Sequence, residues 1–345
     1  MAKIEIVPES IQFLKMSDEE YFSPKYKSYV SNSKIGMLNP QEGGSLEKFK
    51  EGFKSEYSAS FELGSAVHAM ILQPELYEIS EIRKPSGKLG IFVEKVFELR
   101  KQGYPIYAAI EEASIQADYY SGKLKDKRLK TAIKSGLPFY LNRLKVKESI
   151  DKTTIFLSET MSNQFESCLN GLLTNQTAMK ILRPEGLLED PVVFNEYAIL
   201  CELKVTLDSG EEVIIGFKGK LDNVTIDYEQ NQVNLNDLKT SGKPVKYFMG
   251  NHVLVGEDKV WYDGSFQKYH YYRQMGVYLF LLQAAINQQS EQTFKYGANM
   301  VVVETVPNFQ SKVYPISNKL IKAGLDEFKR LLIILAEWKL QGLID

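Results

Sequence analysis

Cysteine, histidine and long apolar runs are scarce in this chain of 345 residues, which has two cysteines and three histidines. Cys168 and Cys201 stand far apart, so they cannot build a four-cysteine zinc or iron–sulfur site, and a histidine-rich metal centre is excluded as well. The longest apolar run, near Val277–Leu282, is far too short to span a bilayer. The first residues have no apolar signal-peptide core. We therefore expect a cytoplasmic protein with no membrane partner.

An excess of charge of one sign is also missing, because 42 Lys and Arg face 44 Asp and Glu. A nucleic-acid site must then come from local segregation of charge. The strongest local bias is Lys123–Lys147, which has nine Lys or Arg and one acidic residue, Asp126. Two interpretations stay open: a solvated basic face, or a track for DNA phosphates that includes Lys125, Lys127 and Lys130.

The length suffices for one large domain or two modest ones, and a hydrophobic content of 44% is that of an ordinary globular protein. We predict an N-terminal helical or irregular segment, 1–60, and a larger domain, 61–345, with a basic helical insertion at 85–155. Within the first segment, Ser31 or Ser33 is a suitable N-cap for a short helix over Lys34–Leu38.

The segment Phe61–Leu72 combines small residues with an apolar run, and Gln73-Pro74 ends it. This pattern predicts a buried helix that carries His68. A lone histidine in an apolar helix is more often a satisfied core residue than a metal ligand.

Periodicity changes along the second half of the chain. Residues 158–183 keep an amphipathic helical period, whereas from Pro191 the period becomes two and predicts three consecutive antiparallel strands. The elements expected after them are a loop over 241–264, a long helix over Ser265–Gln289, a buried strand over Asn299–Val306 and a helix over Ser317–Leu340.

The last two of the three strands, about Val213–Ile226 and Val233–Thr240, flank a polar turn. Asp222 precedes this turn by about as much as Asp237 follows it, so a simple hairpin register brings the two carboxylates together. Lys239 shares the face of Asp237 because side chains alternate along a strand.

Two converging carboxylates repel each other, so their arrangement is costly without a cation. Magnesium is held by one or two carboxylates, water and substrate phosphate. A neighbouring lysine can orient or deprotonate a metal-bound water, or offset charge on a phosphate. The pattern therefore predicts phosphodiester hydrolysis at Asp222, Asp237 and Lys239. Glu196, on the preceding strand, either faces this site or forms an edge-strand salt bridge.

An Asp-x-Lys sequence alone is usually a solvated strand face with a weak ion pair, so the order of the surrounding motifs matters. GSAVH at 64–68, GKLD at 219–222, DLK at 237–239 and QMGVY at 274–278 follow one another in the chain. This ordered set resembles the PD-(D/E)XK nuclease superfamily. More narrowly, it resembles the RecE-type and related phage exonucleases, which resect double-stranded DNA ends for recombination. The N-terminal SNSKIGML segment is similar to the start of those proteins.

The resemblance implies a restriction-endonuclease-like α/β fold, in which helices flank a central mixed β-sheet and the N-terminal part is helical. It implies that His68, Asp222 and Asp237 bind magnesium, for which manganese can substitute, and that Lys239 positions the attacking water. Gln274 and Tyr278, which share a helix face, would hold the substrate strand near the scissile phosphate.

The resemblance further implies an exonuclease acting on double-stranded DNA ends, encoded by a bacterium or a phage. It implies a homo-oligomeric ring around DNA and a single-strand annealing protein as a partner. An endonuclease of the same superfamily and a catalytically inactive DNA-binding relative are the alternatives. One departure is the long 241–264 segment with Trp261 and Tyr262, where a shorter connection is expected, and it leaves open how a DNA end is engaged.

Overall fold

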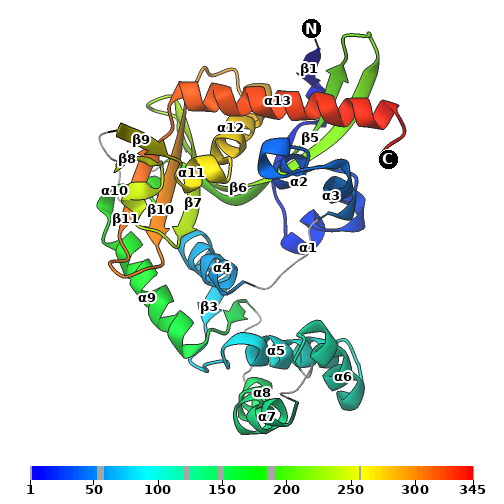
Figure 1. Ribbon diagram of the computed structural model, residues 1–345. Helices are drawn as coiled ribbons and strands as arrows, with labels where there is room; N and C mark the ends of the chain where they lie inside the picture. The colour runs from blue at the N-terminus through cyan, green and yellow to red at the C-terminus, as the bar shows by residue number, and fades with distance from the viewer. Residues whose placement is uncertain are drawn as a thin grey trace. The chain divides into compact units, whose positions relative to one another are not determined.

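The structure is a computed structural model that describes residues 2–52, 58–119, 125–145, 151–184, 191–255 and 258–344. The chain divides into two compact units (Figure 1). Unit 1 consists of Met1–Glu56 and Gly171–Asp345, and unit 2 consists of Tyr57–Asn170. The basic helical insertion predicted at 85–155 lies inside unit 2.

Unit 1 is built on a mixed sheet of seven strands among the described residues. The predicted three-stranded antiparallel meander is confirmed as β5, β6 and β7, and β10 then pairs with β7 in parallel. The sequence analysis did not separate β1 and β2, which both pair with β5. The strands are β1 (Lys3–Ile6), β2 (Gln12–Lys15), β5 (Val192–Thr206), β6 (Glu212–Asp227), β7 (Gln232–Ser241), β10 (Lys295–Glu304) and β11 (Ser311–Pro315).

A row of four asparagines, of which Asn223 and Asn236 are fully buried, fixes the register of the central strands. Asn223 donates a hydrogen bond to Asn195 at 2.7 Å, Asn236 donates to Asn223 at 2.7 Å, and Asn299 donates to Asn236 at 2.9 Å. This asparagine ladder crosses β5, β6, β7 and β10. A slip by one residue would leave buried amide groups without partners, which is costly, so the ladder holds the neighbouring residues of β6 and β7 in place.

Helices cover both faces of the sheet. Asn223 also donates to the carbonyl of Leu182 in α10 (Gln176–Leu182), so α10 lies on the face of the asparagine ladder. The core on the opposite face includes side chains of α12 (Tyr271–Gln289) and α13 (Asn318–Leu340). These helices cross closely at Gly324, where an added Cβ would meet the Tyr272 carbonyl oxygen at 1.9 Å. The predicted α/β fold, a central mixed sheet flanked by helices, is confirmed.

The N-terminal part of unit 1 contains the short helices expected there. Ser31, one of the two predicted caps, accepts a hydrogen bond from the Lys34 backbone N–H and begins α2. The helices of this part are α1 (Asp18–Tyr21), α2 (Asn32–Gly36) and α3 (Leu46–Glu51).

Two predicted helices are each interrupted. The helix expected over Ser265–Gln289 is α11 (Ser265–Lys268) followed by α12, because His270 has a left-handed backbone with φ of 51°. The pattern at 158–183 is α9 (Glu159–Leu173) followed by α10, and Asn175 caps α10 by accepting from the Ala178 backbone N–H. In both places a local cap or turn interrupts the helix, although the hydrophobic pattern of the sequence continues through the break.

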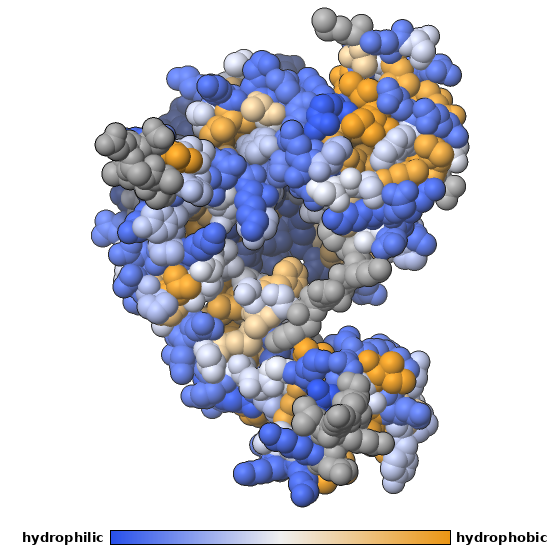
Figure 2. Space-filling model, viewed as in Figure 1, coloured by the Kyte–Doolittle hydropathy of each residue, from blue (hydrophilic) through white to orange (hydrophobic). Residues whose placement is uncertain are grey.

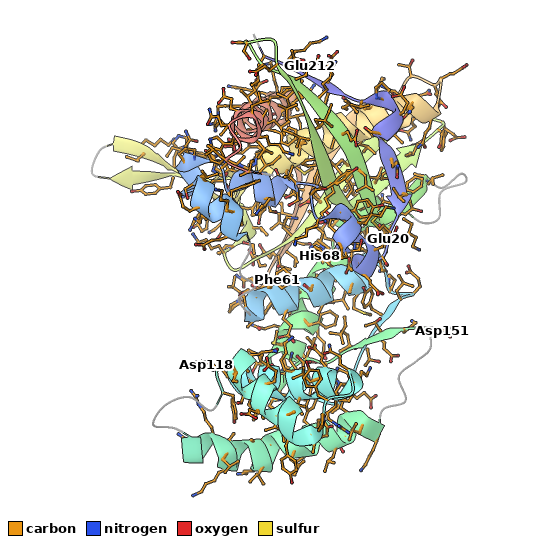
Figure 3. All side chains as sticks on the ribbon, turned by 90° about the vertical axis from the view of Figure 1, so that its right-hand side faces the viewer. Glu20, Phe61, His68, Asp118, Asp151 and Glu212 are labelled. Atoms are coloured by element: carbon orange, nitrogen blue, oxygen red, sulfur yellow. The ribbon has the colours of Figure 1, made fainter. Side chains whose placement is uncertain are left out.

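The segment at 241–264 is not the loop that was expected. It contains a short 3-10 turn, Val245–Tyr247, and an antiparallel hairpin of β8 (Asn251–Val255) and β9 (Asp258–Tyr262). The hairpin extends away from the body of unit 1 (Figure 3).

Unit 2 is mainly helical, with its own core between α5, α6 and α8. The predicted helix over Phe61–Leu72 is confirmed as α4. The elements are α4 (Ala59–Leu72), α5 (Gly87–Lys101), α6 (Ile106–Gln116), α7 (Lys125–Thr131), a π-helical turn (Ala132–Gly136), α8 (Leu137–Lys145), most of α9, and a parallel pair of β3 (Tyr77–Ile79) and β4 (Thr153–Ile155).

The face in Figure 2 is largely hydrophilic, with apolar residues in separate patches. Among the described residues, every helix is too short or too polar to cross a bilayer.

Candidate active site

Two aspartates and a lysine meet where β6 and β7 run side by side. The observed register pairs Asn223 with Asn236, which is the hairpin register predicted from the turn and places Asp222 and Asp237 opposite each other. Lys239 Nζ lies 2.6 Å from Asp237 Oδ2 and 3.7 Å from Asp222 Oδ2. Asp222 Oδ2 also accepts a 2.9 Å hydrogen bond from the Leu238 backbone N–H, which ties this carboxylate to β7.

The electrostatics of the group decide which roles Lys239 can take. Burial opposes the charged form of Lys239, but the carboxylates of Asp222 and Asp237 outweigh it and raise the lysine pKa. The side chain is therefore an ammonium ion near neutral pH. An ammonium can orient a water or offset phosphate charge, but it holds no lone pair with which to remove a proton. Orienting the water and offsetting phosphate charge are the predicted roles that suit an ammonium, and all three roles stay predictions.

Helix α12 contributes two side chains to this group. Gln274 Nε2 donates a 2.7 Å hydrogen bond to Asp237 Oδ1. The Tyr271 ring centroid lies 5.6 Å from Lys239 Nζ, within the range of a cation–π contact. The sequence analysis missed Tyr271, although it precedes Gln274 by three residues and helical spacing places both on one face.

Tyr278 packs into the core of unit 1 and is 8% exposed. Its ring lies against Gly219 of the GKLD motif, where an added Cβ would be 2.6 Å from Tyr278 Cε1. This close approach explains the glycine at that position. Burial also raises the pKa of Tyr278 well above its usual value. The structure thus gives Tyr278 a packing role, and its predicted contact with DNA stays a prediction.

Glu196 faces Asp222 from the neighbouring strand. The register pairs Asn195 with Asn223 and Tyr197 with Leu221, so Glu196 stands opposite Asp222. Its φ of 57° is left-handed, a conformation that is rare for a residue other than glycine inside a strand. Backbone strain of this kind gathers at functional sites.

The side chain of Glu196 combines the two roles predicted for it. It forms a 3.1 Å salt bridge with Lys220, which in turn lies 2.6 Å from Asp18. It also offers a carboxylate oxygen within 4.8 Å of one from Asp222. Lys220 was not singled out from the sequence.

The other predicted site residues lie in unit 2. His68 is half-buried on α4, where Figure 3 labels it. Lys127 and Lys130 are exposed on α7, and Lys125 is the first residue of that helix. The predicted roles of these four residues, in metal binding and in DNA binding, stay predictions.

Not every cation of the basic stretch is available to a phosphate. The Arg143 guanidinium lies 4.0 Å from the Phe97 ring centroid and 4.6 Å from that of Phe156, and it pairs with Glu94 at 3.7 Å. Arg143 is therefore a packing residue of unit 2. Lys123 and Lys147, the ends of the stretch, are outside the described residues.

A second polar cluster fixes the start of α12. Glu327 accepts hydrogen bonds from Arg273 at 2.7 Å and from the Tyr272 hydroxyl at 2.6 Å, and it lies 3.0 Å from His270 Nδ1. Arg273 also contacts Glu42. Glu42, His270 and Glu327 have the spacing of metal ligands, but the Arg273 guanidinium already pairs with both carboxylates. We interpret this cluster as a structural clasp.

Neither cysteine supplies a nucleophile. Both are buried thiols. Burial raises the pKa of Cys168 to about 11, and burial together with the neighbouring Glu202 raises that of Cys201 to about 12. Neither thiol is appreciably ionised near neutral pH.

The comparisons with known proteins give a likeness to solved structures. No model of a known family and no curated protein matches the chain. Among solved structures it is similar to the crystal structure of a protein from Eubacterium rectale named "Putative exonuclease". The identity is 12% and the TM-score 0.49, over 96% of this chain and 89% of that one. The functional conclusion rests on the geometry of the site.

Proposed function

We propose that this protein is a metal-dependent nuclease that hydrolyses DNA phosphodiester bonds, acting as an exonuclease on double-stranded ends. The observation that carries the proposal is the convergence of Asp222, Asp237 and Lys239 on two adjacent strands, with Gln274 holding Asp237 from α12. The Lys239 ammonium lies between two carboxylates, and Glu196 adds a third carboxylate beside them. Packing alone does not require so many charged groups in one place, and such groupings are typical of functional sites.

The donor set fits a hard divalent cation. Asp222, Asp237 and Glu196 offer carboxylate oxygens, the ligands that magnesium and manganese prefer. His68, by the resemblance of its motif, is proposed as a further ligand. When bound, the cation would stabilise charge on the phosphate and lower the pKa of a water molecule. In its absence Lys239 balances the two aspartates, so binding a cation would free the ammonium for substrate.

Each protein group then has a defined task. Lys239 donates hydrogen bonds that orient the attacking water or offset charge on the phosphate. Gln274 and the Leu238 backbone N–H fix the orientations of Asp237 and Asp222, which is the preorganisation that such sites need. Lys125, Lys127 and Lys130 are proposed to contact DNA phosphates away from the cleaved bond.

The choice of an exonuclease rests on the resemblance of the four motifs to the RecE-type group. A homo-oligomeric ring and a single-strand annealing partner are proposed on the same ground. An endonuclease of the same superfamily is the second candidate, since it would use the same side chains. A protein that has lost catalysis is disfavoured by the intact Asp222, Asp237 and Lys239.

The test compares end-labelled linear duplex DNA with covalently closed plasmid, in magnesium, in manganese and with a chelator. We expect metal-dependent release of nucleotides from linear DNA and no cutting of the plasmid. Asp222→Asn and Asp237→Asn should each lower cleavage by about a thousandfold or more, the scale of a group that acts in the transition state. Asp326→Asn, which neutralises an exposed carboxylate on α13, is the control. Near-normal cleavage by either folded site variant would refute the proposal, and cutting of the plasmid would favour the endonuclease.

A further inference from the structure

Four exposed aromatic side chains lie in the segment of the chain between β7 and α12. Tyr247 is 40% exposed, Trp261 46%, Tyr262 51% and Tyr269 55%. They come from the 3-10 turn, from β9 and from the residue after α11. Large aromatic groups are normally buried, and clusters that remain exposed mark binding surfaces.

This segment folds closely upon itself, so the exposed rings belong to one compact structure. An added Cβ at Gly250 would lie 2.4 Å from the Trp261 ring, and one at Gly264 would lie 2.1 Å from the Phe248 carbonyl oxygen. Gln267 of α11 donates a 2.9 Å hydrogen bond to the Met249 carbonyl. The β8–β9 hairpin and α11 are neighbours in Figure 1.

The aromatic series reaches the candidate active site. The rings of Tyr269 and Tyr271 have centroids 5.8 Å apart, and the Tyr271 ring lies 5.6 Å from Lys239 Nζ. Tyr271 is itself stacked on the buried Phe248, at 5.9 Å and with an interplanar angle of 15°. The Tyr271 ring is half-buried and fixed by Phe248, and it connects the exposed Tyr269 with Lys239.

Cations accompany the rings. Lys268 Nζ lies 5.6 Å from the Tyr269 ring centroid, and Lys246 Nζ lies 4.8 Å from that of Tyr247. Lys259 is exposed on β9 two positions before Trp261, so these two residues share a strand face. Rings that offer flat faces, interleaved with ammonium groups, match the alternation of bases and phosphates in an unpaired strand. A duplex hides its base faces by stacking, so it does not offer this pattern.

We propose that Trp261 and Tyr269 form a stacking site for unpaired nucleotides of DNA, with Lys268 contacting their phosphates. In its placement beside the cleaved bond, this site rests on the proposed nuclease function. The bases that adjoin the scissile phosphate stack on Tyr269, which Tyr271 contacts from the side of the site, and those further along the strand stack on Trp261. This proposal gives a function to the segment 241–264, which is longer than the connection expected between the DLK and QMGVY motifs.

The test is binding of a fluorescein-labelled oligothymidylate, followed by anisotropy with a chelator present so that no cleavage occurs. Tyr269→Ala and Trp261→Ala should each raise the dissociation constant about 5- to 100-fold, the loss expected for one stacked base. Tyr269→Phe keeps the ring and should bind as the unchanged protein does. Tyr228→Ala is the matched control, because this tyrosine is 51% exposed but lies at the turn between β6 and β7.

A second variant tests the phosphate contact. Lys268→Gln should flatten the slope of log affinity against log salt by about 0.7, the value for one phosphate on a single strand. The melting temperature of every variant is measured to confirm that it folds.

The outcomes separate this proposal from the proposed function. Affinities of both alanine variants within twofold of the unchanged protein would overturn the stacking site, and so would an unchanged protein that does not bind oligothymidylate. Equal losses on a blunt duplex would overturn its preference for unpaired nucleotides. A protein that binds through these rings but never cleaves linear DNA in magnesium would refute the nuclease function alone.

Discussion

Gln274 donates a 2.7 Å hydrogen bond to Asp237, so a helix side chain sets the orientation of a carboxylate that belongs to a strand. The two residues reach each other across the interface of α12 with the sheet. The same helix turn carries Tyr271, and the clasp of Arg273 and Glu327 fixes where the helix begins. Packing of α12 is therefore coupled to the geometry of the candidate active site.

Gln274→Ala should impair turnover more than stability. A hydrogen bond to a charged group contributes about 1.5–3 kcal/mol, so we expect cleavage to fall by about 10- to 100-fold. Gln288→Ala, on the same helix but bonded to the Pro8 carbonyl, is the control and should cleave normally. Equal activity of the two variants would show that the contact with Asp237 has no functional weight.

Lys239→Ala should lower turnover by about 100- to 10,000-fold, the range of a group that assists proton transfer or charge stabilisation, and leave DNA affinity largely unchanged. Removing the ammonium also leaves Asp222 and Asp237 to repel each other. Added magnesium should therefore raise the melting temperature of this variant more than that of the unchanged protein. Lys243→Ala, an exposed neighbour, is the control. Matching losses in binding and turnover would instead identify Lys239 as a plain phosphate contact.

His68→Ala discriminates between a metal ligand and a packing residue. If His68 is a ligand, the magnesium concentration for half-maximal activity should rise at least tenfold, the loss seen even for residues that only orient a ligand. Titration of cleavage rate against magnesium measures this shift. A lower melting temperature with an unchanged titration would assign His68 to the core of unit 2.

The basic stretch is tested by salt dependence. Replacing Lys125, Lys127 and Lys130 with glutamine should flatten the slope of log affinity against log salt on duplex DNA by about 0.9 for each phosphate that these lysines neutralise. Lys319→Gln with Lys322→Gln, on the exposed side of α13, serves as the control. A slope that does not change in the triple variant would leave these lysines as a solvated face.

The Glu327 clasp should make stability depend on acid pH. Burial alone would raise the Glu327 pKa, but the Tyr272 hydroxyl and the Arg273 guanidinium outweigh it and lower the pKa below its ordinary value of 4.5. A lowered pKa contributes stability above the unfolded value, and this stability is lost as pH falls through the folded value. His270 and Glu42 face the same carboxylate.

Glu327→Gln should then cost about 1.5–3 kcal/mol at pH 7, because it removes the charged acceptor of Arg273 and the Tyr272 hydroxyl while Glu42 still pairs with Arg273. The difference from the unchanged protein should shrink as pH falls below about 4.5, which thermal unfolding at a series of pH values measures. Asp326→Asn, on an exposed ion pair of the same helix, should cost little at any pH. A constant difference across the series would contradict the shifted pKa.

The sequence was most informative where partners are close in the chain. The β6–β7 hairpin could be predicted because Asp222 and Asp237 are nearly equidistant from one turn, and that symmetry fixes the register without any distant contact. Ser31 was recognisable as one of two candidate caps because a cap bonds to a backbone N–H three residues away.

What the sequence did not predict depends on residues far away in the chain. The break before α12 follows from His270, whose partner Glu327 is 57 residues later. The asparagine ladder joins Asn236 to Asn299 across 63 residues, and neither amide is unusual in its local context. The left-handed backbone of Glu196 could not be predicted from the sequence, because a period-two pattern indicates an ordinary extended backbone at that position.

The pairing of β1 and β2 with β5 has a consequence for synthesis of the chain. Ser10 bonds to Glu202, 192 residues later, and the continuous unit 2 is made in between. On the ribosome, unit 2 can fold while the first two strands still wait for their partner. Gln274 and β10 are translated later still, after both aspartates. A nascent chain therefore carries both aspartates before Gln274 and β10 are present to hold them, so we expect the candidate site to form only after β10 has been made.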